Sequence, residues 1–474
     1  MREMLVIQTG QCGNQIGTEF WRTVLREHSL HGTSYTDAMS TFFRNVNQRG
    51  HDLPLYSTIS NLKARSVVID MEEGVVNALL GSDLGGIFDE SLIITDPIGR
   101  GSGNNFAEGY KTYGEAHGDR ILEVVRKTIE ACDSPQGFLF FSSLGGGTGS
   151  GLGARAIELI SEAFEGLSIL SAPIIPSRET DDVVTSPYNT IFSMASLATS
   201  ADVIIPFDNE SITNCVRMLG EKKVNPDKAA TQAAKVRGVD PFANQQEKGQ
   251  KRRPFKEVNQ TVATALSCIT SSMRFGGEMN VDLNELAINL VPFPELNFVC
   301  TSLAPLPMAP PAATIQAAVR NLLLPQNQLI LSTGTQGPSF SLATAILARG
   351  ENINSGELSS AVARLQGAGL VHPSWGSQGV KVGLSSGRPP HASCDAVCLR
   401  NGPQILETVG HVKSSFDKMR KSRMYLHHYE KILGPEEIEF RSQVVDTIIQ
   451  GYQELSRTRG ERRVVEIDVA PIVY

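Results

Sequence analysis

The sequence predicts an α/β protein built on a parallel sheet that helices cover on both faces. Six apolar runs rich in β-branched and aromatic residues alternate with helical patterns such as Asn14–His28 and Gly153–Phe164. The runs expected to form strands are Met4–Gln8, Ser66–Asp70, Ser91–Thr95, Gly137–Ser143, Leu167–Ile175 and Ala201–Phe207. Because parallel neighbours need a crossover connection, usually a helix, this alternation favours a doubly covered parallel sheet.

Length and composition limit the class of protein. The chain has 474 residues, more than a single core usually holds, so about two or three domains are expected. Its hydrophobic content of 41% is ordinary for a globular protein, and no window approaches the roughly 18 apolar residues of a membrane span. The opening Met1–Gly10 lacks the features of a secretory signal, so we expect a cytosolic protein without membrane insertion. The net charge of -7 argues against nonspecific nucleic-acid binding.

The cysteines indicate neither a disulfide framework nor a metal site. Seven of them are scattered along the chain, so we expect reduced thiols. Cys394 and Cys398 are four residues apart, but no second pair of ligands stands nearby in the sequence, and a metal site there is not expected.

Two segments interrupt the regular pattern of the first half. Residues 29–61 are polar and lack a period, which predicts a long surface loop. Residues 215–253 carry ten Lys or Arg against four Asp or Glu. This bias favours a solvated insertion, with a docking surface for an acidic partner as the alternative.

The second half begins with a helical run, Phe255–Arg274, and continues as a mixed α/β region to about residue 400. Apolar residues then recur at spacings of three and four, which predicts two long amphipathic helices that form an antiparallel hairpin. The first helix is defined by Ile405, Val409, Val412, Phe416 and Met419, and the second by Ile438, Val445, Ile449, Tyr452 and Leu455.

Two glycine-rich loops follow predicted strands and indicate phosphate binding. Loop one, Gly10–Gly17, opens the first helix, and loop four, Ser143–Gly153, opens a later one. Glycines let the backbone approach a phosphate, and a helix start supplies free amide donors. Loop four carries no lysine, so it is not a P-loop, but its amides and the Thr148 hydroxyl can coordinate phosphate oxygens. Ligands of parallel sheets bind at this carboxyl edge.

Two further loops lie at the same predicted edge. Loop two, Asp70–Gly74, carries Asp70 and Glu72, which indicate a hydrated Mg²⁺ between carboxylate and phosphate, with helix capping or solvated surface charge as the alternatives. Loop three, Gly101–Tyr110, again places glycine and asparagine before a helix. Four such loops on successive strands are far more specific than any one of them.

Taken together, five blocks of sequence resemble the tubulin family. They are GQCGNQIG (10–17), GSGNN (101–105), GGGTGSG (145–151), SPYNT (186–190) and RFGGEMNVDLNELAINLVPFP (274–294). The resemblance runs from Met1 to about Leu455 and implies head-to-tail assembly into protofilaments. It also implies a Rossmann-like GTP-binding domain over 1–253 with insertions at 29–61 and 215–253, a core helix over 254–274, an intermediate domain over 275–404, and a helical hairpin with a short non-acidic tail over 405–474.

The resemblance also implies which residues contact GTP or GDP. Asp182 matches a ribose contact, Asn209 and Asn259 match the asparagines that read guanine, and Phe255 matches an aromatic residue stacked on the base. The other implied contacts, in loops one, three and four, are Gly10, Gln11, Cys12, Gln15, Asn104, Ser143, Gly146, Gly147, Thr148 and Gly149. Asp70 and Glu72 match the pair near Mg²⁺, which they would hold through water. Ser186 departs from the glutamate of alpha- and beta-tubulins on the ribose side.

Loop four carries no lysine, so the charged groups for catalysis must come from another segment. The candidate is Asn280–Leu286. In tubulins this segment docks over the nucleotide of the next subunit, so Asp282 and Glu285 are expected to activate water there and to complete GTP hydrolysis only on assembly. Their spacing of three predicts that both carboxylates share one helical face. The alternative is a helix capping box, worth about 1 kcal/mol at its cap residue.

Within the family, the local matches are most similar to the epsilon-tubulins, especially Leu25–Gly32 and Lys421–Lys431. The chain also ends in a basic and then apolar stretch, without the acidic tail of alpha- and beta-tubulins. This resemblance implies a structural subunit of centrioles or basal bodies that supports triplet microtubules, with delta-tubulin or alpha/beta-tubulin as longitudinal or lateral partners. The alternatives are a gamma-tubulin-like nucleator and, more remotely, a dinucleotide-dependent enzyme whose ribose ligand would be Asp70.

Overall fold

The computed structural model describes residues 2–96, 99, 101–177, 182–219, 255–312, 314–330, 339–367, 370–373 and 379–458. Its largest sheet runs in the order β5-β4-β1-β6-β7-β8, with β9 also paired to β7, and every pairing is parallel. The strands are β1 (Glu3–Thr9), β4 (Ser66–Ile69), β5 (Ile93–Ile94), β6 (Pro135–Ser143), β7 (Ser168–Ile175), β8 (Val203–Ile204) and β9 (Phe207–Asp208). The predicted parallel sheet is therefore confirmed.

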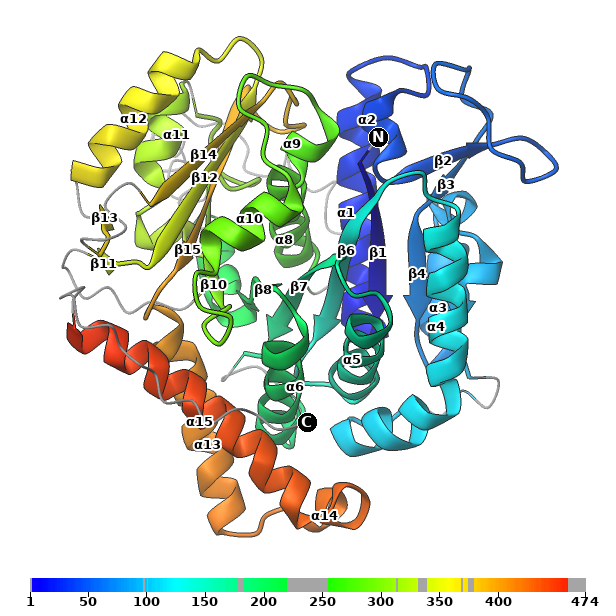
Figure 1. The fold of residues 1–474 in the computed structure, drawn as a ribbon, viewed down its shortest axis with the longest axis vertical. Coiled ribbons are helices and arrows are strands. Elements are labelled where there is room, and N and C mark those ends of the chain that lie inside the picture. The colour runs from blue at the N-terminus through cyan, green and yellow to red at the C-terminus, as the bar shows by residue number, and fades with distance from the viewer. Residues whose placement is uncertain are drawn as a thin grey trace, which may run out of the picture.

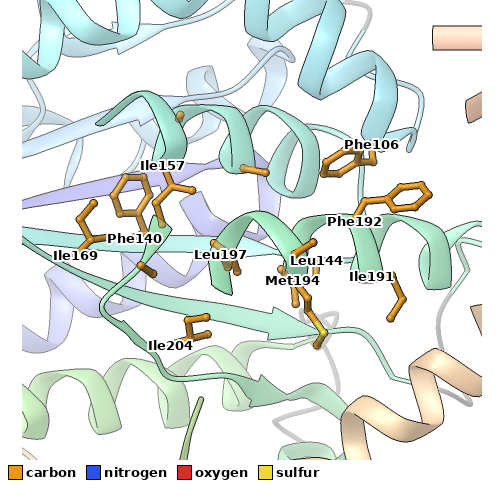
Figure 2. Packing of buried hydrophobic residues seen from close by; sticks show 14 of the residues in the cluster. Phe106, Phe140, Leu144, Ile157, Ile169, Ile191, Phe192, Met194, Leu197 and Ile204 are labelled. Carbon is orange, nitrogen blue, oxygen red and sulfur yellow. The ribbon is translucent and has the colours of Figure 1, made fainter. Parts of the chain in front are cut away.

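Helices cover both faces of this sheet because its strands bury alternate side chains in two separate cores (Figure 1). Leu5 and Ile7 of β1 belong to the core formed with α4 (Gly114–Glu130), α5 (Gly153–Ala163) and α6 (Ser186–Ser200). Figure 2 shows this core between β6, α5 and α6. Met4 and Val6 face the other core, with α1 (Gly10–Ser29), α3 (Glu73–Leu80) and α8 (Lys256–Ile269).

The predicted strand Ala201–Phe207 is instead two short strands, β8 and β9, separated by Ile205 and Pro206. Proline has no backbone N–H to donate to a neighbouring strand, which explains the interruption. Helical residues 209–219 follow β9. Of the basic segment 215–253, residues from 220 onward lie outside the described residues.

The prediction that residues 29–61 form one long surface loop is wrong for residues 35–46, whereas residues 30–34 and 47–60 are exposed or half-buried and belong to no named helix or strand. The segment contains α2 (Asp37–Ser40) and β2 (Phe43–Val46), and β2 pairs antiparallel with β3 (Asn61–Ala64). Phe42 and Phe43 are fully buried and make edge-to-face contacts with Trp21 of α1, at ring-centroid distances of 5.9 and 5.4 Å. A few large apolar side chains therefore fold a polar segment onto the sheet.

The predicted mixed α/β region is a second, four-stranded sheet in the order β10-β15-β12-β14. It comprises β10 (Val299–Ala304), β12 (Ala343–Gly350), β14 (Val380–Ser385) and β15 (Cys394–Asn401). One face packs against α11 (Ile315–Asn321) and α12 (Ser355–Gly367). The other faces α8 and α10 (Leu283–Leu290), which lie between the two sheets (Figure 1).

Four fully buried charges join the two sheets. Glu27 of α1 pairs with Arg274 of α9 (Ser271–Arg274) and with Arg349 of β12, each at 2.7 Å. Arg349 also pairs with Asp395 of β15 at 2.7 Å. Two carboxylates thus balance two guanidinium groups, which is the condition under which buried charges are tolerated.

The C-terminal segment contains the two predicted long helices, α13 (Ile405–Lys421) and α15 (Pro435–Thr458), and also α14 (His427–Leu433) in their connection. Ion pairs join Lys413 to Asp446 and Arg420 to Glu439. From the first pair to the second, the residue number rises on α13 and falls on α15. The two helices therefore run antiparallel, as predicted. No helix among the described residues is long and apolar enough to cross a membrane.

Shorter elements complete the described fold. They are the helical turns η1 (Gly85–Ile87), η2 (Glu90–Leu92), η3 (Glu108–Tyr113), η4 (Thr148–Leu152) and η5 (Pro325–Asn327), and the parallel pair β11 (Ser339–Phe340) and β13 (Leu370–Val371). Of these, η3 and η4 are π-helical and stand at the predicted phosphate loops.

Candidate nucleotide-binding site

Loops one and four touch at the carboxyl edge of the parallel sheet. A Cβ atom on Gly10 would lie 2.9 Å from the backbone nitrogen of Gly149 in loop four, and one on Gly13 would lie 2.3 Å from the carbonyl oxygen of Phe141 in β6, just before that loop. Gly10 also has a φ of +73°, in the left-handed region that favours glycine. Only residues without a side chain let these two backbones approach so closely.

Loop three packs against loop four in the same way. A Cβ atom on Gly147 would lie 2.6 Å from the backbone nitrogen of Asn105, and one on Gly151 would lie 2.2 Å from the carbonyl oxygen of Phe106. The hydroxyl groups of Ser102 and Thr148 are hydrogen bonded at 2.8 Å. Loops one, three and four therefore form one continuous glycine-lined surface.

Helix starts at this surface are left open to an anion. The first turn of α1 holds no acidic residue, and the N-cap residue Thr9 makes no side-chain capping bond. The Thr9 hydroxyl is buried without a hydrogen-bond partner. The η4 turn, which begins at Thr148, likewise has neither an acidic first turn nor a side-chain cap. Free amide donors and an unopposed helix dipole are the groups that bind phosphate.

Loop two places acidic groups beside this surface. Asp70 is 2% exposed, and burial raises its pKa to about 6. The Asn14 side-chain amide donates to Asp70 Oδ2 at 3.3 Å, whereas the buried Asn14 Oδ1 has no partner. A Cβ atom on Gly101 would lie 2.6 Å from Glu72 Oε1, so loop three passes directly over the second carboxylate.

The oxygen atoms of Asp70, Glu72 and Asn14 fit a hydrated Mg²⁺, which usually takes only one or two carboxylates and keeps several waters. Asp70 Oδ1 also accepts the backbone N–H of Glu72 at 3.2 Å, but Glu72 is itself the N-cap residue of α3, so this bond does not cap the helix. The Glu72 side chain itself makes no capping bond to α3. Among the described residues, no group of three or more His, Cys, Asp or Glu side chains could hold a metal ion. A bound Mg²⁺ would therefore need water as a further ligand.

Other predicted contacts lie around the same edge. Gln11 and Gln15 are exposed on the first turns of α1, and Cys12 is half-buried beside them. Ser143 ends β6, and its hydroxyl accepts the backbone N–H of Gly145 at 3.4 Å. A Cβ atom on Gly146 would lie 3.9 Å from the side-chain oxygen of Asn104.

The predicted ribose and guanine contacts are less closely tied to these loops. Asn209 directly follows β9 at the carboxyl edge, and Asp182 is exposed before α6. Phe255 has a φ of +70°, is 45% exposed and stands at the start of α8, one turn before Asn259. Among the described residues, none of these four makes a side-chain hydrogen bond to the glycine loops.

Asp282 and Glu285 lie at the opposite edge of the sheet. A Cβ atom on Gly137 would lie 2.9 Å from Leu283 Cδ2, so α10 begins against the amino end of β6. From Gly137 to Ser143 the strand rises about 20 Å, at about 3.3 Å per residue. A general base must come within about 3 Å of the water that it activates, so these carboxylates cannot act on a nucleotide in their own subunit.

The two carboxylates do not share one helical face, contrary to the prediction from their spacing. Asp282 is the N-cap of α10, and its Oδ1 accepts the backbone N–H of Glu285 at 2.8 Å. This is the capping role that the sequence left as an alternative. Glu285 instead points to Lys381 of β14, with which it forms a partly exposed ion pair.

Sequence reasoning missed Asn14, Ser102 and Asn189 as members of this region. Asn189 is fully buried in α6, where its side chain contacts loops three and four. Its position inside the SPYNT block is a signal that could have identified it. In the sequence analysis this block supports only the resemblance to the tubulin family and predicts no contact for Asn189.

Comparison with known proteins agrees with this geometry. Residues 3–217 match the model of the Tubulin/FtsZ family, GTPase domain. The chain is 38% identical over 472 residues to proteins named "Tubulin epsilon chain" from Homo sapiens and from Mus musculus, covering 97% of each chain. This chain belongs to the tubulin family. It is also 30% identical over 446 residues to "Tubulin beta-1 chain" of Colletotrichum graminicola, covering 93% of this chain and 91% of the other.

Membership of the tubulin family settles the class of ligand and of assembly. Its GTPase domain is a guanine-nucleotide domain, so the chain binds GTP and GDP. The chain is a cytoskeletal protein of a family whose members polymerise with other tubulins, and it is close to the epsilon-tubulins. The remote alternative of a dinucleotide-dependent enzyme is therefore wrong.

Proposed function

We propose that this tubulin is a GTP-binding structural subunit of centriolar or basal-body microtubules, and that its contact with a neighbour completes GTP hydrolysis. GTP binds at the carboxyl edge of the parallel sheet, with Mg²⁺ held through water by Asp70 and Glu72. The start of α10 then covers the nucleotide of the next subunit. Delta-tubulin and alpha/beta-tubulin are the partners, through longitudinal or lateral contacts.

One observation carries the proposal for hydrolysis: the glycine-lined surface and the acidic start of α10 stand at opposite edges of one sheet. Contacts between unlike faces of identical or related subunits build filaments when rotation does not close a ring. In such a filament each α10 reaches a foreign nucleotide. Glu285 is the water-activating residue: the Asp282 carboxylate turns back to cap the helix, whereas Glu285 points outward in a partly exposed ion pair with Lys381.

We assign domains to match these roles. The GTP-binding domain spans 1–253, the core helix 254–274, the intermediate domain 275–404 and the C-terminal hairpin with its tail 405–474. The division is supported by the parallel sheet, the second sheet and the antiparallel α13 and α15, which occupy successive parts of the chain.

The test for hydrolysis is single-turnover cleavage of GTP bound to a polymerising partner tubulin. Wild-type chain is expected to accelerate turnover of the partner's GTP, and Glu285→Ala is expected to abolish that acceleration. Glu278→Ala is the matched control, because Glu278 is an exposed acid on the same approach to α10. Unchanged partner turnover with Glu285→Ala would refute the role of Glu285.

The cellular part of the proposal has its own test. A fluorescently tagged chain in ciliated cells is expected to concentrate at centrosomes or basal bodies. Incorporation throughout the cytoplasmic microtubules would contradict the assignment. It would leave GTP binding untouched.

A further inference from the structure

Asn189 on α6 connects two of the glycine loops to the C-terminal helices. Its side-chain nitrogen donates to the carbonyl oxygens of Asn104, at 2.9 Å, and Gly145, at 2.7 Å. Its side-chain oxygen accepts the backbone N–H of Phe106 at 2.9 Å and the hydroxyl of Tyr429 at 2.7 Å. All four hydrogen-bonding positions of a fully buried amide are therefore filled.

The bond to Gly145 has a direct effect on loop four. In a planar trans peptide the carbonyl and the following N–H point in opposite directions. Because Asn189 holds the carbonyl of Gly145, the N–H of Gly146 is directed away from Asn189. Gly146 belongs to the candidate phosphate loop, so this bond would hold its N–H in place as a donor for phosphate.

The bond to Asn104 holds loop three. Asn104 has a φ of +54°, a conformation that costs free energy for a residue other than glycine. Its carbonyl accepts hydrogen bonds from both Asn189 and the Thr185 hydroxyl. These two bonds from the start of α6 keep the strained residue at the site.

Tyr429 brings the C-terminal helices into the same network. It is 1% exposed in α14, and its ring packs against Tyr188 and Phe192 at centroid distances of 5.0 and 5.6 Å. Packing therefore fixes the ring, and its hydroxyl donates to Asn189. A shift of α14 would remove one of the four bonds that orient the Asn189 amide.

We propose that Asn189 is a positioning residue of the nucleotide site, and that its bond to Tyr429 couples guanine-nucleotide binding to the packing of α14. The inference rests on the proposed nucleotide site. By thermodynamic linkage the effect is reciprocal: GTP stabilises α14, and a partner that displaces α14 weakens GTP binding by the same factor. The C-terminal hairpin thereby senses the nucleotide without touching it.

The chain offers a matched pair of variants to test this coupling. Tyr429→Phe removes the hydroxyl that bonds to Asn189 and keeps the ring. Tyr188→Phe also removes a buried hydroxyl that joins α6 to the C-terminal segment, but that hydroxyl donates to the carbonyl of Met424, at 2.9 Å, and not to Asn189. The two variants thus lose the same group from the same interface.

We expect Tyr429→Phe to bind a fluorescent GTP analogue about two- to tenfold more weakly than wild type, the range of one buried hydrogen bond. Tyr188→Phe is expected to bind like wild type. Hydrogen exchange supplies a second readout, because added GTP should slow exchange of α14 amides in wild type and in Tyr188→Phe, but not in Tyr429→Phe. A loss of stability alone would not remove this response to GTP.

The outcomes separate the two proposals. If wild-type chain does not bind the analogue, the proposed nucleotide site fails. If it binds, but Tyr429→Phe behaves like Tyr188→Phe, the coupling fails and the site stands. If Tyr429→Phe does not fold, hydrogen exchange of the wild-type chain is the deciding measurement. The coupling is overturned if GTP does not slow exchange of the α14 amides.

Discussion

Replacing Asp70 by asparagine is expected to stabilise the nucleotide-free protein and to impair its binding of Mg²⁺ and GTP. Burial raises the pKa of Asp70 from its ordinary value of 3.8 to about 6. Since one pKa unit corresponds to about 1.4 kcal/mol, holding this carboxylate ionised costs the folded protein about 3 kcal/mol. Asparagine has the same shape and carries no charge, so the substitution removes most of this cost.

The surroundings of Asp70 can accommodate an amide. The side-chain oxygen of the new residue can still accept the backbone N–H of Glu72. Rotation of the Asn14 amide presents its Oδ1, which now lacks a partner, to the new side-chain nitrogen. We therefore expect a net gain of about 2 kcal/mol at pH 7.5.

The pH dependence of this effect follows from the direction of the pKa shift. Because the folded pKa of Asp70 lies above the unfolded value, the folded state binds the proton more tightly between about pH 4 and 6. This group's contribution to stability therefore falls as the pH rises through that window, and its full cost is present above about pH 6. Asp70→Asn is expected to remove this part of the pH dependence, so its advantage should vanish towards pH 4.

The assay is urea unfolding of protein stripped of nucleotide with a chelator, at several pH values, beside titrations with Mg²⁺ and GTP. Asp119→Asn, on an exposed position of α4, is the control and should leave both measurements unchanged. Two results would refute the reasoning: Asp70→Asn destabilises the stripped protein at pH 7.5, or it binds GTP in the presence of Mg²⁺ as tightly as wild type.

Two further substitutions test the packing described above. Glu27→Ala leaves buried Arg274 without its carboxylate, so urea unfolding should show a loss of about 3 to 5 kcal/mol, whereas Asp83→Ala, which breaks an exposed pair, should change little. Gly10→Ala places a Cβ atom 2.9 Å from a backbone nitrogen of loop four, so GTP titration should show weaker binding. Gly50→Ala is the control, since Gly50 shares a positive φ but has open space, and equal binding by both variants would contradict the close-contact argument.

The sequence predicted where the loops of the candidate site lie because their signals are local. A glycine run after an apolar strand and before a helix reports on its own backbone, so loops one and four were found with the edge that carries them. The parallel sheet followed from the same local alternation. The order of its strands had to come from the structure.

The sequence could not predict contacts between distant segments. Glu27, Arg274, Arg349 and Asp395 are separated by tens to hundreds of residues, and each looks like an ordinary surface charge until the fold buries it. The prediction of a surface loop over residues 29–61 failed for a related reason. Phe42 and Phe43 follow no periodic pattern of apolar residues, and their packing against Trp21 is what places them in the core.

The spacing of Asp282 and Glu285 shows how a local rule can mislead at a functional position. A spacing of three puts two side chains on one face only when both residues lie inside the helix. Asp282 is the N-cap, with extended backbone angles, and its carboxylate turns back to the helix end. The same sequence therefore fixes the helix start with Asp282 and leaves Glu285 outside the cap, in its ion pair with Lys381.

These placements together suggest why the nucleotide should control assembly. The loops of the candidate site and the start of α10 stand at opposite ends of β6, which rises about 20 Å from Gly137 to Ser143, so under the proposed function a lone subunit would hold GTP without a residue that can cleave it. Under the proposed function, contact with a neighbour would supply the missing carboxylate, and hydrolysis would then exchange GTP for GDP beside loops three and four. Because Asn189 connects those loops to α14, the change from GTP to GDP would alter the packing of α14 in the C-terminal hairpin. A partner bound to the hairpin could then distinguish a subunit before hydrolysis from one after it, which makes the exchange response of α14 to GTP against GDP the most direct measure of this link.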